Sequence, residues 1–119
     1  VKQLENVLDL FYNKGGFEFT LNYLIGKSEM TPFDFYTELS DYYYIKGYQH
    51  RSHSKEDLYR ILYGYAMWKC RHSGVDREEA IRYLEQDMKL RLNEDAVRKF
   101  MKKGWEFPQE KRWQENIRI

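Results

Sequence analysis

The sequence contains a single cysteine, Cys70, among its 119 residues. One thiol forms no internal disulfide, and it cannot supply the several thiolates that a cysteine-based zinc finger or an iron–sulfur cluster requires. Cys70 lies in an apolar stretch, where a free cysteine packs as a small hydrophobic residue. His72 is two positions away, and residues with this spacing face different sides of a helix, which argues against a catalytic cysteine–histidine pair.

The chain also lacks long apolar runs and an excess of charge of one sign. Its apolar runs are a few residues long, far below the ~20 that a membrane span needs, and the N-terminal segment lacks the apolar region of a signal peptide. Twenty basic and 19 acidic residues give a formal net charge of +1. This balance does not favour nucleic acid or an anionic membrane surface as a partner. We expect a cytoplasmic protein without membrane contact.

Most of the sequence has apolar residues three or four positions apart, which is the spacing of an amphipathic helix, and no stretch has a convincing strand pattern. The sequence therefore predicts an all-α fold, a single-domain orthogonal bundle of about five to six short helices. We assign residues 1–105 to this helical domain and residues 106–119 to a C-terminal tail. The tail could form a short helix from Pro108, docked by Trp105 and Trp113.

Glycines mark the predicted ends of the first two helices. The first helix should end at residues 13–16, where glycine permits a left-handed cap, and the second near Gly26. The apolar face of the first helix consists of Leu4, Val7, Leu8 and Phe11. The apolar face of the second consists of Phe17, Leu21, Leu24 and Ile25.

Thr31 and Pro32 predict the start of a third helix, because threonine is a good N-cap and proline fits the first helical position. Gly47 should end this helix. Its predicted buried residues are Phe35, Tyr36, Leu39, Tyr42 and Tyr43. Its predicted exposed residues are Asp34, Glu38 and Asp41.

Ser54 and Asp57 predict a capping box at the start of a fourth helix, which should end at Ser73–Gly74. This helix is apolar on most of its circumference, so we place it at the centre of the bundle. Gly64 in its middle suggests a close helix crossing. The apolar residues are Leu58, Tyr59, Ile61, Leu62, Tyr63, Tyr65, Ala66, Met67 and Trp68.

Asp76 and Asn93 predict the N-caps of a fifth and a sixth helix, the first with Glu79 in a box-like pair and the second ending at Gly104. Their apolar faces consist of Ile81, Leu84, Met88 and Leu92, and of Ala96, Val97, Phe100 and Met101. Acidic residues four positions before basic ones predict a salt-bridged exterior. The pairs are Glu78–Arg82, Glu85–Lys89, Asp87–Arg91, Glu94–Arg98 and Asp95–Lys99.

Aromatic residues are in surplus, with eleven tyrosines. One core does not bury so many comfortably, because each buried hydroxyl needs a hydrogen-bond partner. We therefore predict that Tyr44 and Tyr59, which lie off the main apolar faces, are at the surface. Two interpretations of the surplus stay open: a docking surface for another domain, or simple partial exposure.

Tyr48, His50, Arg51 and His53 form the best local cluster of functional side chains. Two histidines three positions apart could bind a metal ion, although the spacing indicates no third ligand. Arg51 beside a helix N-terminus could hold an anion such as phosphate or carboxylate. The third interpretation is a polar connector whose side chains cap the next helix. The four residues are therefore candidates for an anion or partner contact, and the sequence assigns no catalytic, cofactor-binding or metal-binding residue.

A short basic run is a second candidate for a functional surface. Arg98, Lys99, Lys102 and Lys103, gathered with Arg51 into one patch, could contact RNA. The acidic residues just before the run favour a solvated, salt-bridged helix face instead.

Three segments resemble one particular C-terminal helical domain. They are residues 11–24 (FYNKGGFEFTLNYL), residues 31–65 (TPFDFYTELSDYYYIKGYQHRSHSKEDLYRILYGY) and residues 84–100 (LEQDMKLRLNEDAVRKF). That domain, which has no assigned function, is found at the end of bacterial cobalamin-binding radical S-adenosylmethionine proteins, often labelled Fe–S oxidoreductases. The resemblance covers nearly the whole chain up to about Trp105, without a sharp active-site signature.

The resemblance implies a parent enzyme with an N-terminal cobalamin-binding domain and a central radical barrel, whose 4Fe-4S cluster is held by a C-x3-C-x2-C motif. The present chain lacks this motif, so the cluster, S-adenosylmethionine, cobalamin and the radical chemistry are expected outside it. We expect a non-catalytic accessory domain that packs on those two domains of the same polypeptide and shapes substrate access or recruitment. The alternatives are a free-standing helical interaction adaptor and an RNA-substrate recognition module.

Overall fold

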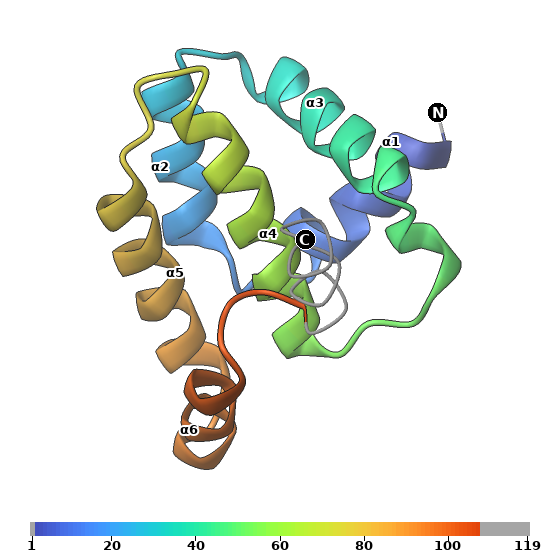
Figure 1. Ribbon diagram of the computed structural model, residues 1–119. Coiled ribbons are helices and arrows are strands. Elements are labelled where there is room, and N and C mark those ends of the chain that lie inside the picture. The colour runs from blue at the N-terminus through green and yellow to red at the C-terminus, as the bar shows by residue number, and fades with distance from the viewer. Residues whose placement is uncertain (1, 108–119) are drawn as a thin grey trace, which may run out of the picture.

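The computed structural model describes residues 2–107, which form helices joined by short loops (Figure 1). This part of the chain contains no strand, so the predicted all-α class is confirmed. None of its helices is long and apolar enough to cross a membrane. The predicted tail helix from Pro108 and the docking of Trp113 lie outside the described residues. The helices are α1 Lys2–Leu8, η1 Asp9–Asn13, α2 Glu18–Ser28, α3 Pro32–Ile45, η2 Tyr48–His50, α4 Lys55–Cys70, α5 Arg77–Arg91 and α6 Glu94–Lys103.

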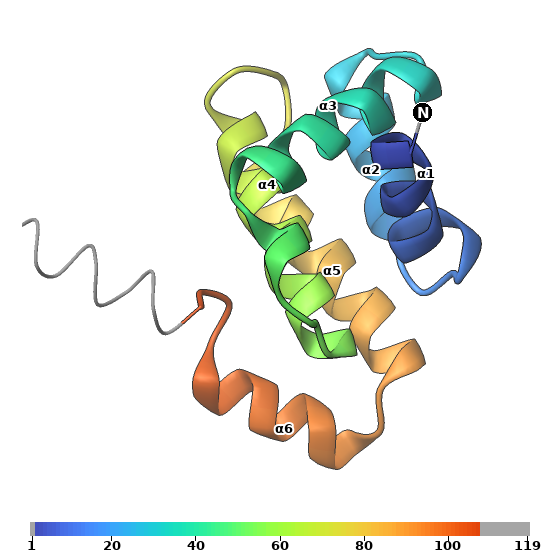
Figure 2. The same cartoon turned by 90° about the vertical axis from the view of Figure 1, so that its right-hand side faces the viewer.

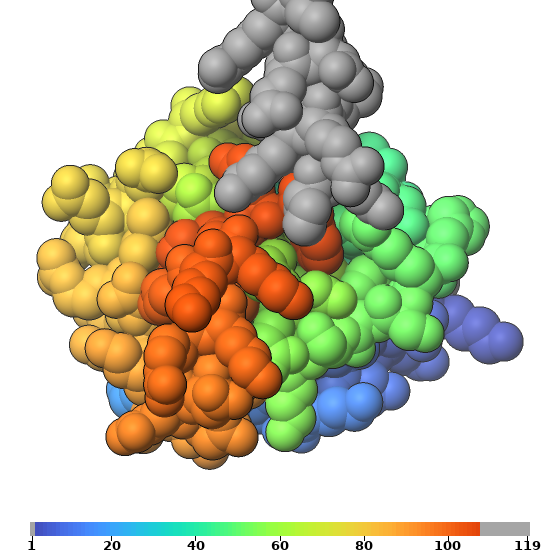
Figure 3. Space-filling model, turned by 60° about the horizontal axis from the view of Figure 1, so that its bottom comes forward, coloured from blue at the N-terminus to red at the C-terminus, as the bar shows by residue number. Residues whose placement is uncertain are grey.

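Helix α4 lies in the middle of the bundle, as predicted, between α3 and α5 (Figure 1). Helix α5 runs antiparallel to α4, and α2 packs along α5. Helix α1 packs against α3 on the other side, whereas α6 lies apart at one end of the bundle (Figure 2). After α6, residues 104–107 turn back across α4, and Figure 3 shows them beside the first turns of that helix.

The ends of the first two helices differ in part from the prediction. Helix α1 continues into the π-helical turn η1, and the chain then turns at Gly15 and Gly16, whose φ values are 73° and 99°. The predicted end at residues 13–16 is therefore confirmed. Helix α2 ends near Gly26, as predicted, although not at this glycine. The helix runs on to Ser28, because Glu29 adopts the left-handed conformation with φ 56° and donates its backbone N–H to the Gly26 carbonyl.

The four predicted N-caps are confirmed by side-chain oxygens that accept from the backbone N–H three residues further on. These contacts are Thr31 at 3.1 Å, Ser54 at 3.2 Å, Asp76 at 3.0 Å and Asn93 at 2.8 Å. The Asp57 carboxylate accepts in return from the Ser54 N–H at 3.3 Å, which completes the capping box. Helix α4 ends at Cys70, earlier than predicted, where the Ser73 hydroxyl donates to the Lys69 carbonyl at 2.8 Å.

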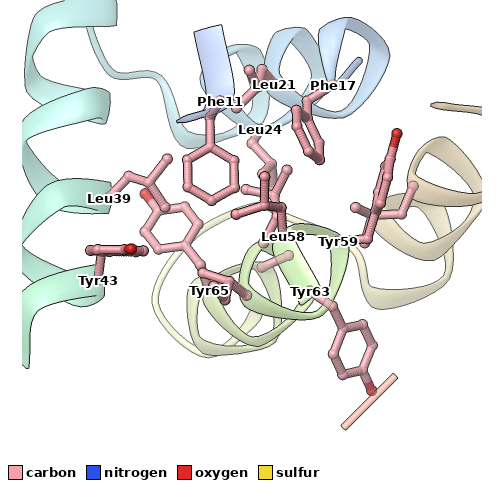
Figure 4. Close-up of a cluster of buried hydrophobic side chains, with 14 of the residues drawn as sticks. Phe11, Phe17, Leu21, Leu24, Leu39, Tyr43, Leu58, Tyr59, Tyr63 and Tyr65 are labelled. Carbon is pink, nitrogen blue, oxygen red and sulfur yellow. The ribbon is translucent and has the colours of Figure 1, made fainter. Parts of the chain in front are cut away.

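The core surrounds α4 and is rich in aromatic rings (Figure 4). The ring of Phe17 lies 5.3 Å from the ring of Phe11 on η1 and 4.6 Å from the ring of Tyr59 on α4. Phe17 thus connects these two elements. Tyr59 is only 1% exposed, so the prediction that it lies at the surface was wrong. Its hydroxyl donates to the Gly16 carbonyl at 2.8 Å, and this bond makes its burial tolerable. Tyr44 is half-buried and accepts a hydrogen bond from Asn6.

Asp87 is a buried carboxylate that the sequence placed on the exterior in a pair with Arg91. This prediction was wrong, since Asp87 is 2% exposed and Arg91 pairs with Glu18 at 3.2 Å instead. The Asp87 carboxylate accepts from the Phe19 N–H at 3.2 Å, and from the N–H and hydroxyl of Thr20 at 2.9 and 2.7 Å. These donors belong to the first turn of α2, so Asp87 fastens α2 to α5.

The crossing of α3 and α4 confirms the close approach predicted at Gly64. The Tyr42 hydroxyl occupies the space that a Cβ atom at position 64 would need. One turn away, Glu38 is partly buried, although the sequence predicted it exposed. Its carboxylate accepts from the Tyr65 hydroxyl at 2.7 Å and pairs with the Lys69 ammonium at 2.8 Å. A buried lysine thus finds its counter-charge across the same crossing.

Candidate functional site

The loop that holds Tyr48, His50, Arg51 and His53 has two inward-facing side chains. Tyr48 is 2% exposed, and His53 is partly buried, with its ring 5.8 Å from the Tyr48 ring and 6.0 Å from the Tyr43 ring. His53 Nε2 lies 2.7 Å from the Tyr48 carbonyl. Since a carbonyl oxygen only accepts, Nε2 carries the proton, and Nδ1 is buried without a hydrogen-bond partner. His53 therefore links the end of the loop to Tyr48 at its start.

Arg51 stacks on aromatic rings of two different segments. Its guanidinium lies 5.3 Å from the Tyr48 ring centre and 4.8 Å from that of Phe107. Such cation–π contacts tie the loop to the segment that returns from α6. His50 is exposed, and its Nε2 lies 3.3 Å from the side-chain nitrogen of Gln49. The structure thus brings Tyr48, Arg51 and His53 together and leaves His50 outside the cluster.

The three interpretations of this loop fare differently. Ser54 and Asp57 already satisfy the N-terminus of α4, which agrees with a connector that caps the helix. Within residues 2–107, no three or more histidine, cysteine, aspartate or glutamate side chains gather in a way that could hold a metal ion. An anion or partner contact at Tyr48, His50, Arg51 and His53 stays a prediction.

Cys70 and His72 do not form a reactive pair. The His72 ring lies 5.2 Å from the Trp68 ring, in the turn that follows α4. Burial raises the pKa of the Cys70 thiol, with a further contribution from the negative charge of Asp76. The thiolate form is therefore scarce at neutral pH, which is the opposite of what a nucleophilic cysteine requires.

The basic run on α6 is balanced by neighbouring acidic residues. Lys99 and Lys103 line a hollow of about 410 Å³ together with Glu56, Asp57 and Asp95. Lys99 pairs with Asp95 at 3.2 Å, so this predicted exterior pair is confirmed. Arg51, the fifth member of the predicted RNA patch, is stacked on the rings of Tyr48 and Phe107 instead.

A second hollow, which we call the α4 groove, was not expected from the sequence. It has a volume of about 570 Å³ and runs along the exposed side of α4, between the end of α3 and the segment Trp105–Glu106. Its charged lining residues are Lys46, Arg60, Arg71, Arg77 and Glu106. These positions are far apart in the sequence and form no run, so no local pattern signals them; only the folded chain brings them together.

Several large apolar side chains remain exposed. Ile45 is 84% exposed, Phe33 68%, Leu90 64% and Tyr12 57%. The Tyr12 ring lies 5.8 Å from the ring of Tyr36, which is one helical turn from Phe33. Tyr12 lies on η1, which continues α1, and Phe33 and Tyr36 lie on α3, so we call these three residues the α1–α3 patch.

Comparison with known proteins gave one match. Neither a curated protein nor a solved structure matched the chain. The model of the family described as "Protein of unknown function (DUF4080)" matches residues 1–118. This match covers almost every residue, including all helices and both hollows described above. The chain therefore belongs to the DUF4080 family.

Proposed function

We propose that this chain is a non-catalytic helical accessory domain of a cobalamin-dependent radical S-adenosylmethionine enzyme of the Fe–S oxidoreductase type. It would pack on the catalytic core of the same polypeptide and shape the access or recruitment of the substrate. The resemblance of residues 11–24, 31–65 and 84–100 to such domains supports the proposal. These residues include most of the α2, α3, α4, α5 and α6 framework.

The observation that carries the packing role is the α1–α3 patch. Single exposed apolar residues are ordinary on a protein surface. Here Tyr12 and Phe33 are more than half exposed and flank the largely buried Tyr36. Aromatic side chains with one apolar and one wet face are enriched at protein interfaces. We therefore assign the α1–α3 patch to the contact with the catalytic core.

The cofactors of such an enzyme do not fit the residues of this chain. A C-x3-C-x2-C motif supplies three thiolates to its cluster, whereas the sequence contains one cysteine, Cys70. Burial also raises the pKa of that thiol, which disfavours the thiolate that binds iron. The proposal therefore places the cluster, S-adenosylmethionine and cobalamin on other domains, and we derive no chemical step through them.

The first test is to follow the reading frame upstream of the Val1 codon and to express the protein that the complete frame encodes. The proposal expects several hundred further codons that include C-x3-C-x2-C. It also expects iron-dependent absorbance in the purified anaerobic protein. A start codon directly upstream of Val1, or a long frame without the motif, would contradict the proposal and favour a free-standing adaptor.

The second test locates the contact by hydrogen exchange, measured on this chain alone and within the full-length protein. We expect slower exchange in the full-length protein for peptides that contain Tyr12 and Phe33. Phe33→Asp should abolish that protection, whereas Leu90→Asp, a matched change at a similarly exposed position, should leave it intact. Identical exchange of the α1–α3 patch in both proteins would refute the assigned contact.

A further inference from the structure

The residues that line the α4 groove carry more positive than negative charge, whereas the chain as a whole is nearly neutral. Four cationic residues and one carboxylate line it, while the full sequence has a net charge of only +1. The hollow beside α6 is the internal comparison, since three cationic and three acidic residues line it. A concave surface lined by one sign of charge attracts ligands of the opposite sign. The groove is thus suited to an anion.

One of the four cations is held in place by the fold. Arg60 is 8% exposed, and its guanidinium donates to the Gly104 carbonyl at 3.0 Å and to Asp57 at 3.1 Å. Arg77 is exposed at the groove, and the Tyr63 hydroxyl raises its pKa. Because Asp57 already pairs with Arg60, the cations open to a ligand are Lys46, Arg71 and Arg77.

The other two cations, Lys46 and Arg71, are exposed at the groove. Lys46 is the C-cap residue of α3, and its ammonium lies 5.8 Å from the centre of the Tyr42 ring. Arg71 is the C-cap residue of α4. Their long side chains can follow a ligand, so the groove combines fixed and adjustable positive groups.

Aromatic rings form the remaining specific feature of the groove. Tyr42, Tyr63, Trp68 and Trp105 line it. The Tyr63 and Trp105 rings are stacked on each other, with centres 5.2 Å apart and planes at 22°, and Tyr63 points away from the core towards the returning segment (Figure 4). Trp68 is 39% exposed, so part of its indole surface is open to solvent. Aromatic side chains beside cations provide a stacking surface for a base next to a binding site for its phosphates.

We propose that the α4 groove binds a phosphate-bearing nucleotide, with the phosphates at the cations and the base at the exposed indole of Trp68. The volume of about 570 Å³ is in the range of small-ligand sites. A free nucleotide and a single-stranded nucleic acid share this chemistry. The proposal goes beyond the accessory role and does not rest on it, because it concerns a ligand of this chain alone.

Isothermal titration calorimetry of the chain with ATP tests the proposal. Tripolyphosphate supplies the anion without the ring, and adenosine supplies the ring without the anion. ATP should bind more tightly than either compound. A twelve-nucleotide oligoadenylate forms the second arm: oligoadenylate binding that ATP displaces identifies a single strand as the source of the nucleotide, whereas binding of ATP alone identifies a free nucleotide.

Variants locate the ligand. Lys46→Gln combined with Arg71→Gln should weaken ATP binding by about tenfold for each phosphate contact removed, which is about 1.4 kcal/mol. Arg82→Gln combined with Lys89→Gln removes the same charge from exposed positions on α5 and should have no comparable effect. Trp68→Ala should weaken the binding of ATP and leave that of tripolyphosphate unchanged. Circular dichroism confirms that each variant is folded.

Three results would overturn the proposal. They are the absence of heat with both ATP and oligoadenylate at millimolar concentration, equal loss of affinity in the groove and α5 variants, and equal affinity for ATP and tripolyphosphate. The first two reject the groove as an anion site, and the third rejects the role of Trp68. None of these results depends on whether the α1–α3 patch contacts a catalytic core, so the two proposals fail independently.

Discussion

At the scale of single residues, the buried polar groups carry much of the fold's specificity. Within residues 2–107, Asp87 has no cationic partner and is satisfied by three donors from Phe19 and Thr20. Burial raises the pKa of the Asp87 carboxyl, and the hydrogen bonds from Thr20 and Phe19 limit that rise. A carboxylate at the N-terminus of α2 also interacts favourably with the helix dipole.

Asp87→Asn should therefore lower the free energy of unfolding by about 2 kcal/mol at pH 7. The amide offers one acceptor oxygen where the carboxylate offered two, and its NH2 group would face the donors of Thr20 or Phe19. Urea denaturation measures the change. Asp95→Asn, the same substitution at an exposed position, should cost less than about 0.5 kcal/mol. Equal effects at the two sites would show that Asp87 is not an anchor.

The sequence could not have identified these residues. Asp87 stands four positions before Arg91, which is the pattern of a surface ion pair, and only the packing of α5 on α2 shows which face it occupies. Tyr59 was misplaced for a similar reason, because its partner is the carbonyl of Gly16, 43 positions away. The cations of the α4 groove form no run either. Long-range polar contacts leave no local periodicity, so they cannot be read from spacing.

At the scale of the elements, prediction from the sequence succeeded wherever the signal was local. The N-caps at Thr31, Ser54, Asp76 and Asn93 depend on contacts three residues apart, and all were predicted. The end of α2 lies two residues beyond Gly26, the glycine that was taken as its stop signal. Gly26 is helical, and a Cβ atom there would have no neighbour within 4 Å. Its presence in the helix therefore has no steric explanation.

Two glycines lie near the ends of α2, and replacing each with alanine should change the stability in opposite directions. Gly26→Ala should raise the free energy of unfolding by about 0.5–1 kcal/mol, because alanine is the better helix former and the space is open. Gly16→Ala should lower it by about 1–3 kcal/mol, since φ at this position is 99°. Thermal or urea unfolding of both variants measures the contrast. A destabilising Gly26→Ala would contradict the described course of α2.

At the scale of the whole molecule, the tyrosines couple stability to alkaline pH. Burial raises the pKa values of five of them, and a hydrogen bond to a glutamate contributes at two, to Glu38 from Tyr65 and to Glu79 from Tyr23. They are Tyr23, Tyr36, Tyr43, Tyr59 and Tyr65. A group whose pKa is raised in the folded state adds stability that is complete below its unfolded pKa of about 10 and is lost as the pH rises above it.

We therefore expect the free energy of unfolding to fall as the pH rises above about 10, by about 1.4 kcal/mol per pH unit for each shifted tyrosine. Urea denaturation between pH 8 and pH 11 measures the slope, and absorbance at 295 nm follows tyrosinate formation. Part of the ionisation should coincide with the loss of helical circular dichroism. If all tyrosines ionise near pH 10 while the helices persist, the described burial of the aromatic core is wrong.

The returning segment also has a kinetic consequence. Two contacts join this segment to α4. The Arg60 side chain donates to the Gly104 carbonyl, 44 positions away in the sequence, and the Trp105 ring stacks on the Tyr63 ring. These contacts can form only after α4 and α6 exist, because each needs a surface that the helices create. Late contacts of this kind contribute little to the folding transition state and act mainly on the rate of unfolding. We therefore expect residues 104–107 to lengthen the lifetime of the folded state by slowing its unfolding.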